Sequence, residues 1–158
     1  MSVFDTLYLV VFVFVIAISG ILISITTAPI ASALQPILNT TVGGNQSIGV
    51  MTSATDSLDF IIVAIAFGSM LFAVVSAWMI NSHPVFIFPA IIFGAISLFI
   101  APFIANTFGG FITDPAIAPT VNAKFPMTTS LFQYYPYFIL GAFILVALMT
   151  LGKPAERG

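Results

Sequence analysis

Residues 60–107 read FIIVAIAFGSMLFAVVSAWMINSHPVFIFPAIIFGAISLFIAPFIANT, a run of 48 residues without one charged side chain. As a single α-helix this run would be about 72 Å long, whereas the hydrocarbon core of a bilayer is roughly 30 Å thick. The chain must therefore fold back within it. Its polar interruption, Asn81-Ser82-His83-Pro84, lies near the middle. The run predicts a tight helical hairpin, with one membrane span over 60–80 and the next over 85–106.

The four residues of this interruption suit a turn between helices. Pro84 disfavours helical backbone at His83 and is accepted in the first turn of the following helix, while Asn81 and Ser82 favour turns and caps. His83, the only histidine, has an alternative role as a metal ligand or general base. No second histidine, cysteine or nearby carboxylate accompanies it in the sequence. We therefore prefer the turn, with His83 at the headgroup level.

Two further apolar stretches, 7–26 and 135–151, are each long enough for one crossing. The chain is 60% hydrophobic, only 5% charged and has a mean hydropathy of +1.20, whereas soluble domains carry about a quarter charged residues. The sequence thus predicts an all-α integral membrane protein with four transmembrane helices. Residues 1–158 form one membrane domain in this prediction, with outer connections over 27–59 and 107–134.

The charged residues all lie near the ends of apolar stretches or in the predicted connections, as expected from the cost of a charge at the bilayer centre. They are Asp5, Asp56, Asp59, Asp114, Lys124, Lys153, Glu156 and Arg157. Asp56 and Asp59 are predicted in the first turn of the second span, where carboxylates complement the helix dipole. Ser53 and Asp56 there resemble a capping box.

The composition argues against several kinds of chemistry. The predicted spans hold no Asp, Glu, Lys, Arg or His, which disfavours proton relays and ion-coupled transport. The chain has no cysteine, so disulfides and thiolate metal sites are excluded. No basic patch supports nucleic-acid binding. The sequence predicts no catalytic residue, no cofactor and no metal site.

Orientation follows from the distribution of lysine and arginine. Lys153 and Arg157 lie in the C-terminal tail, against Lys124 alone in the two long connections. The positive-inside rule then favours N- and C-termini on the cytoplasmic, inner side. Asn39 and Asn45 begin N-x-[ST] triplets of the glycosylation type, which we interpret as chance occurrences. Residues 7–26 are preceded by no basic residue and are interpreted as a retained span rather than a signal peptide.

Small residues recur four apart in the predicted spans, which allows close helix approach in a bilayer. The second span has the longest run and is predicted to be covered by another span, of this chain or of a neighbour, while its Phe60, Phe67 and Leu71 lie mostly elsewhere. The predicted helix-packing residues are Gly20, Ala64, Gly68, Ser69, Ala73, Ala77, Ala90 and Gly94.

Two stretches together resemble a known group. SHPVF at 82–86 opens a span, and KFPMTTSLFQYYPYFILGAFILVALMTLGK at 124–153 approaches and forms the last one. The pair resembles small multi-span membrane proteins encoded by viruses of bacteria and archaea and by virus-like elements. The matching positions are His83-Pro84, Phe125-Pro126, Tyr135-Pro136 and Gly152-Lys153, within a stretch from about Asp59 to Lys153. The resemblance implies a virion or viral-membrane component rather than an enzyme.

Three functions are compatible with these observations. The first is a structural membrane protein in a lipid bilayer, as a homo-oligomer or in a larger membrane or virion assembly. The second is an accessory subunit of a cellular membrane complex, and the third is a holin-like channel-forming protein. A channel needs a polar helix face, whereas the predicted spans show only scattered serines. The structural role is therefore preferred.

Overall fold

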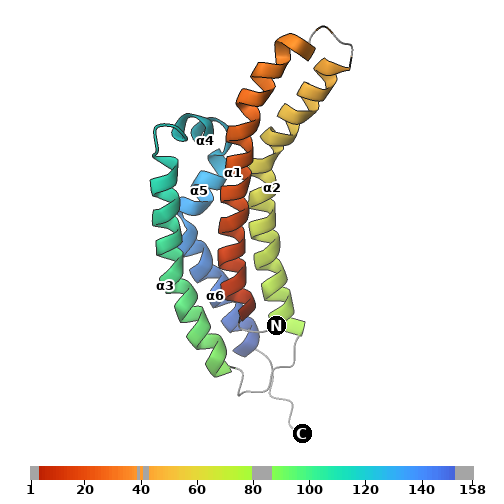
Figure 1. The fold of residues 1–158 in the computed structure, drawn as a ribbon. Helices are drawn as coiled ribbons and strands as arrows, with labels where there is room; N and C mark the ends of the chain where they lie inside the picture. Colours follow the sequence, from red (N-terminus) through yellow and green to blue (C-terminus); the bar gives the residue numbers. More distant parts are fainter. Residues whose placement is uncertain (1–3, 39, 41–42, 80–86, 152–158) are drawn as a thin grey trace.

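The computed structural model describes residues 4–38, 40, 43–79 and 87–151, and all regular structure in these residues is helical. Four long helices run side by side, and two short ones close one end of the bundle (Figure 1). The elements are α1 (Phe4–Leu38), α2 (Gly44–Met79), α3 (Ile87–Ile112), α4 (Ala118–Lys124), α5 (Pro126–Gln133) and α6 (Tyr135–Leu151). The predicted turn Asn81–Pro84 lies outside the described residues.

The long helices are compatible with a multi-pass membrane protein. Within the described residues, three stretches are long and apolar enough to cross a bilayer: Val11–Leu38, Gly44–Val75 and Gly94–Ile112. A fourth crossing is obtained if α5 and α6, which are bent by 67° relative to one another, form one broken span. The predicted fourth span, 135–151, coincides with α6.

The region predicted as a connection over 27–59 is mostly helical, because α1 continues to Leu38 and α2 already begins at Gly44. Its many hydroxyl side chains do not interrupt these helices. Instead they donate hydrogen bonds to carbonyl oxygens one turn back, as Thr27 Oγ1 does to Ile23 O (2.6 Å) and Thr52 Oγ1 to Ile48 O (3.0 Å). Hydroxyls satisfied in this way are compatible with a helix.

The region predicted as a connection over 107–134 is also ordered. Helix α3 runs past Pro102 to Ile112. A turn follows, in which Asp114 Oδ1 accepts a hydrogen bond from the Ala116 N–H (2.8 Å). The turn leads into α4 and α5, which cover one end of the bundle (Figure 1).

The α1–α2 seam is lined by small and β-branched residues. Val13, Ala17, Ile21 and Ser24 of α1 are buried, at intervals of three or four residues. A Cβ atom added to Gly20, on the same face, would lie 3.0 Å from Ile62 Cδ1 of α2. The side chain of Ile62 therefore packs directly against the backbone at Gly20, where a small residue is needed.

The second part of the core is an aromatic cluster where α5 meets α6. Phe132 of α5 is 0% exposed and stacks on Phe108 of α3 with ring centroids 4.2 Å apart. It also stacks on Tyr135 of α6 at 5.0 Å and meets Phe14 of α1 edge-on at 6.0 Å. One side chain thus joins four helices at the bend.

Candidate functional site

The junction between α4 and α5 needs a cap from elsewhere in the chain. Phe125 separates the two helices, and Pro126 is the first residue of α5. Proline is well suited to that position. Phenylalanine, however, has no side-chain acceptor for the free N–H groups in the first turn of a helix, and Phe125 makes no side-chain cap.

Asp59 of α2 supplies the missing acceptors. Its Oδ1 accepts a hydrogen bond from the Thr128 N–H (2.7 Å) and its Oδ2 accepts one from the Met127 N–H (3.0 Å). The Asp59 side chain is buried, with its residue 6% exposed. The carboxylate also lies at the N-terminus of α5, where the helix dipole favours a negative charge. This buried charge is therefore satisfied by both hydrogen bonding and electrostatics.

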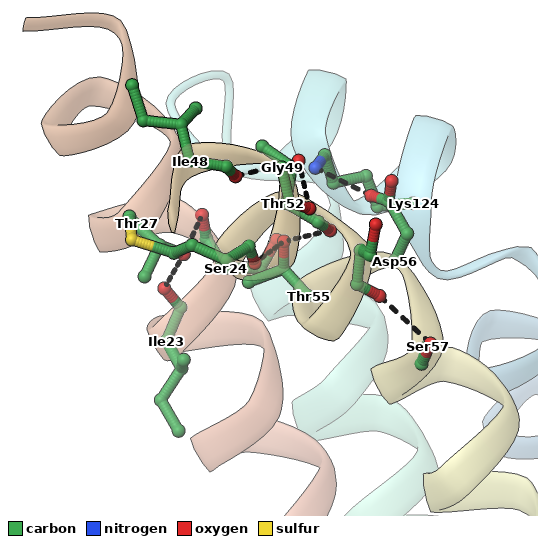
Figure 2. Close-up of polar contacts among 12 residues, drawn as sticks. Ile23, Ser24, Thr27, Ile48, Gly49, Thr52, Thr55, Asp56, Ser57 and Lys124 are labelled. Atoms are coloured by element: carbon green, nitrogen blue, oxygen red, sulfur yellow. Dashed lines mark hydrogen bonds and ion pairs between the residues drawn. The ribbon is translucent and has the colours of Figure 1, made fainter. Parts of the chain in front are cut away.

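One helical turn away on α2, Asp56 pairs with the only lysine in the described residues. Lys124 Nζ lies 2.9 Å from Asp56 Oδ1 (Figure 2). The pair is accessible, with the lysine side chain 30% and the aspartate side chain 62% exposed. An exposed pair contributes less than about 1 kcal/mol. It nevertheless attaches the last residue of α4 to the same helix that caps α5.

Together the two carboxylates of α2 hold the segment 124–128 in place. Both oxygens of Asp59 are engaged by backbone N–H groups, which is the arrangement of a helix cap. Figure 2 also labels Ser24 of α1 and Thr55 of α2, which are both buried. Thr55 Oγ1 donates to the carbonyl oxygen of Thr52 at 2.8 Å. We call Asp56, Asp59 and residues 124–128 the clamp.

The sequence prediction for these two acids was wrong. Asp56 and Asp59 do not lie in the first turn of α2, which begins at Gly44, and the proposed capping box is absent because Ser53 lies inside the helix. The Ser53 carbonyl instead accepts a hydrogen bond from the Ser57 hydroxyl (2.9 Å). The sequence Lys124-Phe125-Pro126 could have indicated that Asp59 caps α5, because a helix starts there without a capping side chain of its own.

The predicted helix-packing residues fall into three groups. Gly20 and Gly94 are buried against other helices, Ala73 is buried, and Ser69 is half-buried. Ala77 and Ala90 lie in α2 and α3, but their side chains are outside the described set. Ala64 and Gly68 are exposed, and a Cβ on Gly68 would meet nothing within 4 Å. Neither residue packs against another helix within the described residues, so their predicted cover by a span of a neighbour stays a prediction.

The clamp explains why Ala64 and Gly68 do not lie on the buried face of α2. Asp59 must face α5, and Ile62, Ala66 and Ala73 lie on the same buried face. At about 100° per residue, nine residues place Gly68 on the opposite side of the helix from Asp59. Phe60 and Leu71 are exposed, in agreement with their predicted position away from the packed face.

We expect Gly94→Leu to destabilise the helix packing and Gly68→Leu to be tolerated by the fold. A Cβ on Gly94 would overlap the ring of Phe143 of α6, whereas Gly68 has open space. Overpacking of this kind costs about 1–3 kcal/mol. Unfolding of both variants in mixed micelles, followed by circular dichroism, measures the difference. Equal free energies of unfolding would contradict the α3–α6 contact at Gly94.

The described residues contain no group of three or more histidine, cysteine or acidic side chains placed to hold a metal ion. Comparisons with models of protein families, with curated proteins and with solved structures found no match to this chain. The resemblance to virus-encoded membrane proteins therefore stays a prediction. The clamp, derived from the geometry alone, is the best-defined polar site of the described chain.

Proposed function

We propose that this protein is a structural component of a membrane, packed laterally in several copies or beside a larger partner. The observation that carries the proposal is the use of the buried carboxylate: Asp59 binds two backbone N–H groups of α5 and thereby fixes the bundle. The outer surface is covered by large apolar side chains from α1, α2, α3 and α6, among them Phe72, Phe99 and Tyr137. Such a surface suits contact with lipid and with other helices.

The charged residues indicate where the bilayer lies. The exposed Asp56–Lys124 pair and Asp114 lie at the end of the bundle that α4 closes (Figure 1). These groups would be costly within hydrocarbon. From Asp59 to its last residue, Met79, α2 has a length of roughly 30 Å, which matches the hydrocarbon thickness. We therefore place the bilayer between the clamp and the opposite end of the bundle, with the clamp at one interface.

The setting proposed for the assembly is a virion membrane, as the resemblance in 82–86 and 124–153 implies. An accessory subunit of a cellular membrane complex is the alternative. Genes for capsid and packaging proteins beside this one would support the first, and genes for enzyme or transporter subunits the second. The proposed inner-side position of both termini applies to either setting.

Counting copies in a bilayer tests the structural role. Because the chain has no cysteine, Asn122→Cys, at an exposed position on α4, gives one fluorophore per chain. We expect several bleaching steps per spot in vesicles at high lipid dilution. Single steps throughout would reject self-assembly, and the leading proposal would then require a larger partner to co-purify from native membranes. Release of a trapped dye by the same vesicles would favour the channel-forming alternative.

A further inference from the structure

The beginning of α2 carries a modification motif. Residues 45–47 read Asn-Gln-Ser, the N-x-[ST] pattern that accepts N-linked sugars when x is not proline. Of the five asparagines in the chain, only Asn39 and Asn45 begin such a triplet, and Asn39 lies outside the described residues. On the sequence alone we interpret both triplets as chance occurrences. The position of Asn45 in the fold changes that interpretation.

Asn45 lies at the tip of the molecule that is farthest from the proposed bilayer along α2. The paired ends of α1 and α2 project beyond α4 and α5 (Figure 1), and Asn45 is the second residue of α2, directly after the connection 39–43. From Asn45 to Asp59 the helix rises by roughly 21 Å, at about 1.5 Å per residue. Because the clamp is placed at the membrane interface, Asn45 lies well outside the hydrocarbon.

The side chains of the triplet are accessible. Asn45, Gln46 and Ser47 are all exposed, and no hydrogen bond within the described residues involves the Asn45 amide. The Ser47 hydroxyl donates a hydrogen bond to the Gly43 carbonyl oxygen (3.1 Å), which water can replace at an exposed site. A Cβ atom on Gly43 or on Gly49 would meet nothing within 4 Å. The described chain therefore leaves room for a sugar on both sides of the triplet.

The triplet also lies where a helix opens most easily. It belongs to the first turn of α2, whose backbone N–H groups have no acceptors within the helix. Helix ends fray, and Gly43-Gly44 before the triplet restricts the backbone little. The chain at 45–47 can thus leave the helix and enter the active site of a modifying enzyme without disturbing the packed part of α2.

The surroundings of Asn45 lack the charges that usually hydrate a protein surface. Residues 28–55 include no acidic, basic or histidine residue, although Ile30, Ile37 and Val50 are exposed there. Apolar side chains do not specify what covers them, whereas an Asn-x-Ser triplet specifies the group that it accepts. An N-linked oligosaccharide is bulky and solubilising, and its hydroxyl groups would hydrate this end of the molecule.

We infer that Asn45 is a site of N-glycosylation. The inference rests on the proposed placement of the bilayer and of the termini, which puts Asn45 on the outer side of the membrane. The donor class is a sugar linked through phosphate to a polyprenol in the same membrane. A bond forms between Asn45 Nδ2 and C1 of the sugar, while the bond from C1 to the phosphate oxygen breaks. The amide gives up one proton, the lipid phosphate leaves, and no oxidant or reductant is required.

Mass spectrometry of the tagged, full-length protein from membranes of the organism that encodes it tests the inference. All variants carry Asn39→Gln, so that only one triplet remains. Beyond the tag, we expect a mass above the 16.8 kDa of the bare chain, with the added sugar located at Asn45 by peptide mapping. Ser47→Ala removes the triplet and should abolish the added mass, whereas its matched control Ser47→Thr preserves the pattern and should retain it. A bare Asn45, or equal sugar content in the two Ser47 variants, would overturn the inference.

Two further measurements separate the possible failures. Gly49→Cys gives a single, exposed thiol near the triplet, which a membrane-impermeant maleimide should label in intact cells. If the thiol is labelled and Asn45 is bare, the inference fails and the membrane placement stands, whereas protection of the thiol removes both. If Asn45 carries a sugar but the bleaching experiment shows single steps, the modification site stands and self-assembly fails. Several bleaching steps with a bare Asn45 would have the opposite meaning.

Discussion

Asp59→Asn is expected to lower the free energy of unfolding by about 2–3 kcal/mol, although it only replaces one carboxylate oxygen by an NH₂ group. The carboxylate accepts hydrogen bonds through both oxygens, from Met127 and Thr128. An amide keeps one acceptor and turns an N–H₂ group toward the other backbone N–H. Hydrogen bonds to a charged group contribute about 1.5–3 kcal/mol each. The N-terminus of α5 also loses its compensating charge.

Denaturation in mixed micelles by increasing sodium dodecyl sulfate, followed by circular dichroism, gives this free energy. The matched control is Asp56→Asn, one turn away on the same helix. Its carboxylate forms an exposed pair with Lys124, so we expect a loss below about 1 kcal/mol. Equal losses for the two variants would show that the cap on α5 does not contribute more than a surface ion pair.

Phe132→Ala is expected to have the largest effect of any single truncation, about 3–5 kcal/mol. The ring is 0% exposed and stacks on Phe108 and Tyr135. Its removal leaves a cavity between helices that the bend at α5–α6 holds in place, so the site cannot easily collapse. Aromatic pairs also contribute about 0.5–1.5 kcal/mol beyond their buried area.

The control for Phe132 is Phe99→Ala in α3, whose side chain is 77% exposed. In micelles this ring contacts detergent in the folded and unfolded states alike, so its truncation should change the free energy of unfolding by less than about 1 kcal/mol. The same titration measures both variants. A small effect at Phe132 would mean that the neighbouring helices close around the cavity. The bend between α5 and α6 would then be less rigid than its packing indicates.

The helices themselves were predictable where the sequence is apolar and uninterrupted. The described part of α2 reaches Met79, Ile80 of the predicted second span lies outside the described residues, and α6 covers the predicted fourth span. Helices α1 and α2 extend beyond the predicted spans 7–26 and 60–80, whose lengths follow from the thickness of a bilayer. Thr27 and Thr52 lie in the additional turns. Their hydroxyls donate hydrogen bonds to carbonyl oxygens of their own helix. Composition alone does not reveal whether such residues lie in a helix or in a loop.

The clamp could not be predicted in the same way, because its partners are far apart in the chain. The role of Asp59 depends on a helix that starts at Pro126, and local patterns near 59 pointed to the helix it belongs to. The face of α2 that the rest of the chain covers was not predictable for the same reason. Small residues at spacing four occur on several faces, and only the partner of Asp59 decides that Ala66 points inward and Gly68 outward.

The distance along the chain between Asp59 and its partners also sets an order of assembly. Met127 is 68 residues downstream of Asp59. During synthesis, α2 is made before the residues whose backbone N–H groups bind its buried carboxylate. Until they emerge, the Asp59 carboxylate must stay hydrated, which leaves α2 free to shift toward the interface. The packing of α2 into its final position is therefore a late event of biogenesis, which requires the C-terminal third of the polypeptide.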